Sequence, residues 1–474
     1  MADWDLATLD AVGQARLVAS GEVSAGELVQ SAIDRIEALN PALNAVTWTR
    51  YEQALAEAAS PGSGPFGGVP LLLKDLGVPA AGHPAHAGSR ALKEAGLRSD
   101  ADCALVERFR AAGLILLGRT NTPEFGLICD TSNEAYGETH NPWRHDRSAG
   151  GSSGGAGAAV ASGMVPVAHG SDGGGSIRMP ACHCGLVGLK ASRGRVSDGP
   201  GQGNGMFGHN TSGALTRSVR DSAAMLDVMA AAEPPTPALP VPAAGSFAAA
   251  LGERPGPLRI GFVTASTHPK YPADPVVSAA VETAAKVFID AGHEVENAWP
   301  RALFEERYWE VWSDALSACV TVAVDDARGV AGSRAEFAAE TRFWDARGRT
   351  RTAADLTRDL SWLDEYSRRL ASWWNDFDVL LSPVMVSPPK PLGYFWSYPE
   401  GLVDSIDVIQ YTPQFNTSGL PAISLPCEWT ADGLPIGVQL GGRLGSEAML
   451  LSLAAQFEQL RPWAQRYPAR EQVG

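Results

Sequence analysis

The sequence predicts one large α/β domain. Short apolar runs that are typical of buried strands recur from residue 70 to residue 440, and segments with apolar residues at helical spacing separate them. No tandem repeat is present. A chain of 474 residues buries roughly three quarters of the surface that its unfolded form exposes, so a core forms without disulfides. Strands that alternate with helices from end to end favour a single layered structure.

The first part of the chain, residues 1–65, is predicted to be helical. Ser24 and Glu27 form a capping box ahead of apolar residues at helical spacing. Pro41 is expected to end this helix because proline lacks the backbone N–H that a helix interior requires.

The central part, residues 66–232, begins with a strand–helix–strand unit. The apolar runs at 70–75 and 114–117 predict two buried strands, and a helix is expected between them. Glycine and serine then dominate residues 148–175, which hold one short helical patch at 156–161.

A Pro- and Ala-rich linker at 233–257 leads to the C-terminal α/β part, residues 258–474. This part contains a helical segment rich in Trp at 303–376. Its other predicted elements are strands at 258–263, near 295, and at 379–382, 422–425 and 436–440, and helices at 275–291 and 446–460.

Composition and charge exclude several classes of protein. The chain is 45% hydrophobic and 19% charged, which is too apolar for a disordered protein. Its net charge of −15 argues against nucleic acid or an anionic membrane as a partner, since both attract basic surfaces. The acidic N-terminus is not a secretory signal, and the longest uncharged stretch, 148–170, is too rich in Gly and Ser to span a membrane. Six scattered cysteines are typical of a reduced cytoplasmic protein.

Two motifs and one lysine indicate where the chemistry lies. The motifs are Gly150-Gly-Ser-Ser-Gly-Gly155 and Asp172-Gly-Gly-Gly-Ser-Ile-Arg178. Lys74 is one of six lysines and stands inside an apolar run, where an ammonium is costly unless it is paired or neutralised. Taken alone, a Gly/Ser-rich stretch is more often a flexible loop, and a strand-end lysine can extend its head group to solvent.

Together these features resemble the amidase signature family of serine hydrolases. The similarity covers nearly the whole chain and implies a single domain with a mixed, twisted β-sheet core and helices on both faces. The matching segments are Gly68-Val-Pro-Leu-Leu-Leu-Lys-Asp75, Thr120-Asn-Thr-Pro-Glu124, Asn141-Pro-Trp143, Gly150 to Gly155, Gly170 to Pro180, Gly185-Leu-Val-Gly-Leu-Lys190, Leu215-Thr-Arg-Ser-Val-Arg-Asp221, Phe415-Asn-Thr-Ser-Gly-Leu-Pro421 and Pro435-Ile-Gly-Val-Gln439.

The resemblance implies a Ser-cisSer-Lys triad within the catalytic core. Ser176 matches the nucleophile, Ser152 matches the bridging serine that follows a cis peptide bond, and Lys74 matches the general base. A serine hydroxyl needs a base beside it at neutral pH, and lysine serves only if burial lowers its pKa well below ~10.4. The backbone N–H groups expected to form the oxyanion hole belong to Gly173, Gly174, Gly175 and Ser176.

Charged neighbours of the triad are interpreted as structural support. Asp172 and Arg178 flank the nucleophile and are expected to pair and hold its loop. Asp75 either orients Lys74 or caps the strand. The departures from the family pattern, which are expected to affect loop packing and pocket shape, are Ser171, Gly173 and Lys190-Ala-Ser192.

Loops that face the substrate in the family supply the expected pocket. Trp residues of the helical segment either line its entrance or belong to the core, and the core is slightly favoured. The expected substrate-binding residues are Phe125, Ile128, Cys129, Thr131, Tyr136 and Met206, and the Trp residues in question are Trp309, Trp312 and Trp344.

Other catalytic and binding motifs match short segments of the chain, but the surrounding residues that each motif requires are missing. Gly150 to Gly154 fits the G-x-S-x-G elbow, but no apolar strand precedes it. Ser387-Pro-Pro-Lys390 fits S-x-x-K, but two prolines forbid the helix that this motif requires. A phosphate loop would need a Gly-Lys-Ser/Thr ending, which is absent. Cys182-His-Cys184 has no second ligand pair at usable spacing, so we expect no metal.

The sequence therefore predicts an amidohydrolase that cleaves apolar or aryl amides through an acyl-enzyme. The closer likeness is to stand-alone bacterial amidases, including nylon-oligomer hydrolases, and carbamates (urethanes) are chemically adjacent substrates. The alternatives are a glutamine-hydrolysing amidotransferase A-type subunit and a non-catalytic binding protein. We expect no cofactor, no nucleic-acid or membrane partner, a small amide as substrate, and a monomer or homodimer in the cytoplasm.

Overall fold

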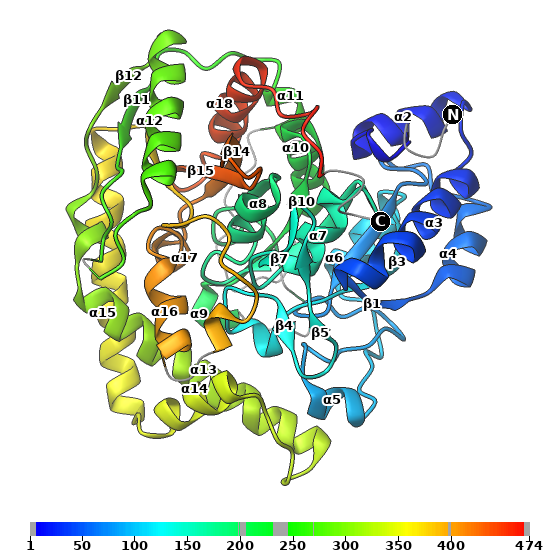
Figure 1. Ribbon diagram of the computed structural model, residues 1–474, viewed down its shortest axis with the longest axis horizontal. Coiled ribbons are helices and arrows are strands. Elements are labelled where there is room, and N and C mark those ends of the chain that lie inside the picture. The colour runs from blue at the N-terminus through cyan, green and yellow to red at the C-terminus, as the bar shows by residue number, and fades with distance from the viewer. Residues whose placement is uncertain are drawn as a thin grey trace.

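A mixed β-sheet runs through the whole molecule (Figure 1). The structure is a computed structural model that describes residues 6–197, 199, 205–230, 245–268, 270–396 and 400–468. Within these residues the sheet has eleven strands, which are, from one edge to the other, β1 (Val46–Thr49), β3 (Ile115–Thr120), β2 (Pro70–Lys74), β8 (Val167–Asp172), β10 (Thr211–Thr216), β9 (Val187–Lys190), β14 (Ala422–Trp429), β15 (Pro435–Gly442), β13 (Val379–Pro383), β11 (Arg259–Phe262) and β12 (Glu294–Glu296).

Parallel pairs lie toward the two ends of the sheet. Strand β2 is parallel to both β3 and β8, and β11 is parallel to both β12 and β13. The pairs between β8 and β13, like the edge pair of β1 and β3, are antiparallel. Two short hairpins lie outside this sheet: β4 (Ser132–Asn133) with β5 (Gly137–Glu138), and β6 (His140–Asn141) with β7 (Arg144–Ser148).

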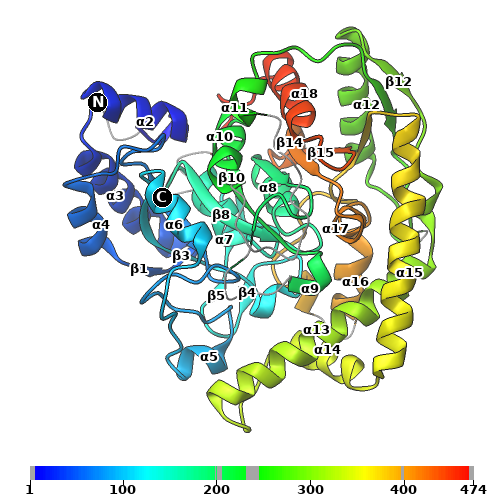
Figure 2. The same cartoon turned by 180° about the vertical axis from the view of Figure 1, so that it is seen from behind.

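Helices cover both faces of the sheet, as Figures 1 and 2 show from opposite sides. On one face the apolar core includes α6, α10, α12 and α18, and on the other it includes α3, α7 and α8. The helices are α2 (Ala11–Ser20), α3 (Ala25–Leu43), α4 (Tyr51–Ala58), α5 (Arg90–Glu94), α6 (Ala104–Ala111), α7 (Gly154–Ala161), α8 (Arg178–Cys184), α9 (Gly205–Gly208), α10 (Val219–Met229), α11 (Phe247–Ala250), α12 (Pro275–Asp290), α13 (Arg307–Ala331), α14 (Ala339–Arg349), α15 (Ala353–Ala371), α16 (Glu400–Val408), α17 (Pro413–Ser418) and α18 (Glu447–Leu460).

Strand β2 shows how this layering places a lysine. Leu71 and Leu73 belong to the core on the α6 side, whereas Leu72 belongs to the core on the α7 side. Successive side chains of a strand point to opposite faces, so Lys74 falls on the face of Leu72, toward α7. Asp75 then falls on the opposite face. The alternation delivers one buried amine to the side of the sheet that carries the Gly/Ser-rich loop.

The Trp-rich segment forms a further layer beside the sheet. It folds into α13, α14 and α15, which pack on one another and enclose a separate apolar cluster. In Figure 1, α13 and α14 lie across the lower part of the molecule and α15 runs up its left side. The predicted helical segment at 303–376 is thus confirmed.

The structure bears on two predicted boundaries. Pro41 does not end its helix: α3 runs on to Leu43, and Asn44, in a left-handed conformation with φ 48°, caps it through a bond to Asn40 O. Proline is tolerated there because it lies in the last turn, where few bonds remain to be lost. Of the predicted linker at 233–257, residues 231–244 lie outside the described residues, and α11 follows with Phe247 buried.

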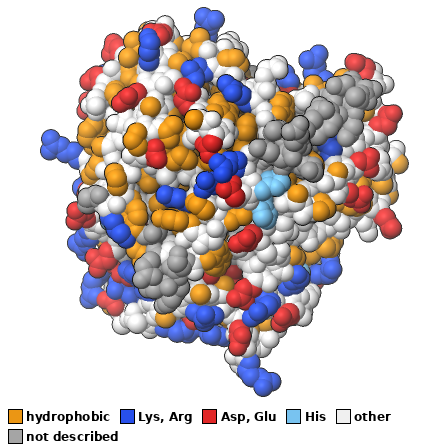
Figure 3. All heavy atoms as spheres, viewed as in Figure 1, with side chains coloured by type: hydrophobic (Ala, Val, Ile, Leu, Met, Phe, Trp, Pro, Cys, Tyr) orange, Lys and Arg blue, Asp and Glu red, His pale blue; other side chains and the backbone are white. Residues whose placement is uncertain are grey.

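Neither a membrane-spanning helix nor a surface patch of a single charge is found where the structure can be examined, that is, in the described residues and on the face drawn in Figure 3. None of the helices in the described ranges is long and apolar enough to cross a lipid bilayer. Figure 3 shows acidic and basic side chains interspersed with apolar ones over one face of the molecule.

Candidate active site

Lys74 ends β2 as a buried amine. Its side chain is 0% exposed, and its Nζ donates to Ser152 Oγ at 2.7 Å and to Ser171 Oγ at 3.0 Å. Burial lowers the pKa of Lys74 to about 7, against the opposing effect of the nearby Asp172 charge. Much of the amine is therefore neutral near pH 7, which is the state that a general base needs.

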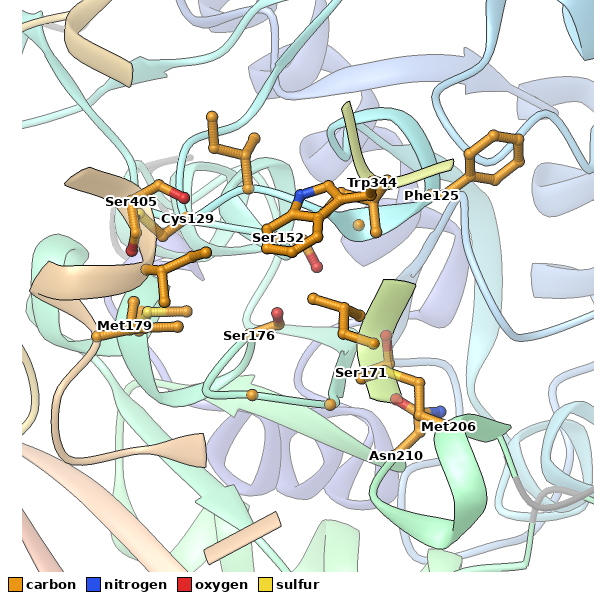
Figure 4. A pocket seen from close by; sticks show the side chains of 18 of the residues that line it. Phe125, Cys129, Ser152, Ser171, Ser176, Met179, Met206, Asn210, Trp344 and Ser405 are labelled. Atoms are coloured by element: carbon orange, nitrogen blue, oxygen red, sulfur yellow. The ribbon is translucent and has the colours of Figure 1, made fainter. Parts of the chain in front are cut away.

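The loop before α7 presents Ser152 to this amine. The peptide bond between Gly151 and Ser152 is cis. Gly151 leaves no room for a side chain, since a Cβ there would lie 2.6 Å from Ile128 O. Ser152 and Ser176 line the same cavity, and Figure 4 shows both hydroxyls facing it.

An ion pair organises the loop that carries Ser176, between β8 and α8. Asp172 accepts hydrogen bonds from the N–H of Gly175 at 2.7 Å and of Ile177 at 3.2 Å. Arg178 donates to the same carboxylate through Nε at 3.0 Å and Nη2 at 2.9 Å. Burial alone would raise the pKa of Asp172, but the Arg178 guanidinium holds it well below its ordinary value. The pair is ionised and fully buried.

The late motifs of the chain complete this network. Arg178 also donates to Asn416 Oδ1 at 2.6 Å and to Gln439 Oε1 at 2.8 Å. Asn416 Nδ2 in turn donates to the backbone carbonyl of Asp172 at 2.8 Å and to its carboxylate at 2.9 Å. Residues of the C-terminal part therefore fix the loop that carries Ser176.

We predict that Asp172→Asn destabilises the protein strongly. It removes the charge that compensates a fully buried guanidinium, and breaking such a pair costs about 3–5 kcal/mol. Thermal and denaturant unfolding measure the loss. Asp146→Asn is the matched control because it breaks the exposed pair with Arg144, where little change is expected. Equal unfolding midpoints for Asp172→Asn and the parent would contradict the assignment.

The backbone N–H groups around Ser176 are not equivalent. The N–H of Gly175 is occupied by Asp172, so it is removed from the set expected from sequence. The N–H groups of Gly173, Gly174 and Ser176 donate to no acceptor within the part of the chain that the structure describes. These three groups are therefore the ones that remain to bind an oxyanion.

A cavity opens over these serines (Figure 4). Four residues expected from sequence line it: Phe125, Ile128, Cys129 and Met206. The other described lining residues are Leu76, Gly126, Leu127, Ser152, Ser171, Gly173, Gly174, Ser176, Met179, Asn210, Trp312, Leu316, Trp344, Ser405, Ile406 and Ile409. None of these lining residues is Asp, Glu, Lys, Arg or His.

Two expected pocket residues are placed elsewhere. Thr131 is not among the lining residues that the structure describes; its Oγ1 donates to Gly150 O at 2.8 Å and accepts from Gly154 N at 3.0 Å, so it holds the Gly/Ser-rich loop. Tyr136 also lies off the cavity, with its hydroxyl bonded to His86 Nδ1. Both side chains form hydrogen bonds that support loops. Their spacing along the chain does not indicate this role.

The Trp residues divide between cavity and core. Trp312 of α13 and Trp344 of α14 line the cavity and are also buried in the apolar cluster beside the sheet, so they have both of the roles considered. A Cβ on Gly174 would lie 3.2 Å from the Trp312 ring, so the indole sits directly on the Ser176 loop. Trp309 does not line the described cavity and packs against Tyr308.

Ser171 and Asp75 have different relations to Lys74. Ser171 was expected to affect loop packing and pocket shape, and its hydroxyl is in addition a direct partner of the Lys74 amine. Asp75 accepts from the backbone N–H groups of His86 and Gly88 and forms no bond to Lys74. Its role is to hold the neighbouring loop.

Metal binding finds no support in the described residues. Among them, no group of three or more His, Cys, Asp or Glu is arranged to hold a metal ion. Cys182, His183 and Cys184 lie buried within α8, and Cys182 Sγ accepts from the N–H of Gly437 at 3.2 Å.

Comparison with known proteins identifies the family of this chain. The amidase family matches residues 27–451. The chain is 39% identical to 6-aminohexanoate-cyclic-dimer hydrolase of Paenarthrobacter ureafaciens, over 97% of this chain and 96% of that protein. This chain belongs to the amidase family. It is also 34% identical to an acylamidase of Rhodococcus erythropolis, over 99% of each protein.

Solved structures share the amidase fold over its whole length. A structure of 6-aminohexanoate cyclic dimer hydrolase complexed with substrate has a TM-score of 0.94 and 37% identity, and covers 99% of this chain and 100% of the other. A bacterial aryl acylamidase of the amidase signature family has a TM-score of 0.86 and 28% identity, with 96% and 97% covered. The predicted family and fold class are thus confirmed.

In this amidase the motif at 120–124 links the cavity wall to α14. Glu124, next to Phe125 on the cavity wall, accepts from Ala338 N at 2.8 Å and from Thr341 Oγ1 at 2.6 Å. These bonds hold the start of α14, the helix that carries Trp344. The motif therefore connects the cavity wall at Phe125 to α14.

Sequence reasoning missed several residues of the amidase site. Asn416 and Gln439 stand in quoted motifs but received no role. Asn210 and Ser405 were not singled out, although both line the cavity. Only Ser171 had a usable signal in the sequence, because it directly precedes Asp172 of the Ser176 motif.

Proposed function

We propose that this amidase hydrolyses neutral apolar or aryl amides through a Ser-cisSer-Lys triad. The observation that carries the proposal is an uncharged cavity that ends at Ser152 and Ser176, with the Lys74 amine 2.7 Å behind Ser152. Ser176 is the nucleophile, Ser152 relays the proton and neutral Lys74 is the base.

The proposed reaction begins at Ser176. Ser176 Oγ attacks the amide carbonyl carbon while its proton passes to Ser152, whose own proton passes to Lys74. The N–H groups of Gly173, Gly174 and Ser176 stabilise the oxyanion. The C–N bond then breaks as Ser152 protonates the leaving nitrogen and recovers a proton from Lys74. Water repeats the sequence on the acyl-enzyme and releases the carboxylic acid.

The cavity lining supports a neutral substrate. A carboxylate or ammonium on the substrate would lose its water with no opposite charge to meet it among the described lining residues, and such burial is expensive. Glutamine carries both charges, which argues against the amidotransferase-type alternative. Neutral carbamates and nylon-oligomer-like amides fit the same lining. Two relatives point the same way, since they are named for a cyclic amide and for acylamides.

We predict a strong preference for neutral acyl chains. Release of p-nitroaniline from butyryl p-nitroanilide should exceed that from the succinyl analogue by roughly a hundredfold or more in kcat/KM, because the succinyl carboxylate would be buried unpaired. Ammonia release from glutamine should be undetectable. Comparable rates for the two anilides would contradict an uncharged acyl site.

We also predict esterase activity from the same serine. An alkoxide or phenoxide leaves more readily than an amine anion, so an acyl-enzyme route that cleaves anilides also cleaves p-nitrophenyl butyrate. Ser176→Ala should abolish both activities together. An ester activity that survives this substitution would indicate a second site.

The remaining expectations concern the whole molecule. We propose a cytoplasmic enzyme that works as a monomer or homodimer without a cofactor. Light scattering on the purified protein measures its mass directly, and full activity after dialysis against a chelator tests the absence of a metal.

A further inference from the structure

The cavity contains two polar side chains away from the Lys74 end. These are Asn210 and Ser405, which Figure 4 shows on opposite sides of Ser176. The rest of the described lining beyond the three serines near Lys74 is apolar or glycine, apart from the indole N–H groups of Trp312 and Trp344. A polar group in such a lining is informative, because pockets of this kind fix ligand orientation with a few placed hydrogen-bonding groups.

Asn210 lies between a tight turn and a strand. Asn210 follows the tight turn of α9 and directly precedes β10, and its N–H donates to Gly205 O at 3.2 Å. Met206 and Phe207 in this turn adopt left-handed conformations with φ 51° and 58°. Asn210 Oδ1 would lie 3.7 Å from a Cβ placed on Gly173, so the amide sits against the loop that supplies the oxyanion donors.

The side-chain amide of Asn210 has unused hydrogen-bonding capacity. It forms no hydrogen bond with any residue that the structure describes, and Asn210 is only partly buried. In the empty cavity water can serve this amide. A purely apolar ligand would remove that water and leave a donor and an acceptor unpaired, which is unfavourable.

We propose that Asn210 is a specificity-determining residue that binds a second carboxamide of the substrate. Its Nδ2 donates to the carbonyl oxygen of that group. The preferred substrates are then neutral molecules with two amide groups, or an amide and a carbamate. This inference rests on the proposed function.

The second group belongs to the acyl side of the substrate. The oxyanion donors of Gly173 and Gly174 bind the acyl carbonyl, and Asn210 lies against Gly173. The leaving nitrogen instead faces Ser152, which protonates it.

The test uses acyl p-nitroanilides in matched pairs. One series carries a terminal acetamido group after two to five methylenes, and the other carries unsubstituted alkanoyl chains of equal length. The parent should favour the acetamido member at one or more lengths by roughly tenfold in kcat/KM, which corresponds to one net hydrogen bond. Asn210→Leu should remove this preference, mainly through KM, while hydrolysis of the alkanoyl series continues.

Two further variants keep the test decisive. Met206→Leu alters the same turn and the same cavity without a hydrogen-bonding group, so it should shift both series alike and keep the preference. Asn210→Asp keeps the shape of the side chain but cannot donate, so it should lose the preference even if the Leu variant folds poorly.

The outcomes separate the two proposals. If the parent cleaves the alkanoyl anilides but never prefers an acetamido partner, or if the preference survives both Asn210 variants, this inference is wrong and the proposed function stands. If the parent cleaves no anilide or ester of either series, the proposed function fails and the inference fails with it.

Discussion

Ser176→Ala is expected to reduce kcat for a neutral anilide by roughly four to six orders of magnitude, the loss seen when a nucleophile is removed from a catalytic serine unit. Ser176 is the serine that lines the cavity beside the N–H groups of Gly173 and Gly174. Without its hydroxyl no acyl-enzyme forms. Steady-state release of p-nitroaniline and thermal unfolding measure activity and fold separately.

The neighbouring serine provides the control for this loss. Ser153 is also buried, but its hydroxyl donates to the Ser171 carbonyl at 3.3 Å and it does not line the described cavity. Ser153→Ala should therefore keep kcat within about tenfold of the parent. A serine-directed acylating probe should add its mass to the parent and to Ser153→Ala but not to Ser176→Ala. Probe labelling of Ser176→Ala at full yield would overturn the assignment of the nucleophile.

Lys74→Met is expected to lower kcat/KM by several orders of magnitude, because it removes the only base within hydrogen-bonding distance of Ser152 among the described residues. Lys74→Arg should not restore activity, since guanidinium keeps its proton throughout the working pH range. In the parent, kcat/KM should rise with pH and level off on the basic side, which we call the basic limb. Burial lowers the pKa of Lys74 to about 7, so the amine is protonated and inactive below that pH and neutral above it. Initial rates from pH 5 to 10 with a neutral anilide measure this limb.

Lys190 is the matched control for the lysine. It is also fully buried, and burial lowers its pKa to about 7 as well. Its Nζ, however, donates to the carbonyl of Ala191 and does not reach the lining serines. Lys190→Met should therefore keep the basic limb in the pH profile, even if stability changes. If the limb vanished in Lys190→Met and persisted in Lys74→Arg, Lys74 would not be the base.

Much of the fold and part of the site could be read from local pattern. The apolar run that ends in Lys74, the capping box at Ser24 and the glycines around Ser176 each express a short-range rule of burial, capping or backbone space. Such rules act within a few residues, so the residues themselves carry the information. The alternation along β2 even assigns Lys74 and Asp75 to opposite faces before any tertiary contact is known.

What the sequence could not supply depends on which distant groups meet. Arg178 bonds to Gln439, 261 residues away, and no local pattern encodes that pairing. The same holds for the loss of the Gly175 N–H to Asp172, the turning of Thr131 and Tyr136 into loop support, and the unused amide of Asn210.

The sequence by itself therefore determined the layered α/β fold, the family resemblance and the lysine and serines that define the candidate triad, because each depends on residue type and near-neighbour spacing. Only the tertiary structure decided which N–H groups remain for an oxyanion, which side chains line the cavity and that its described lining carries no charge. These properties arise from hydrogen bonds and packing between segments far apart in the chain. A polar group that already forms a hydrogen bond with another part of the protein is not available to the substrate.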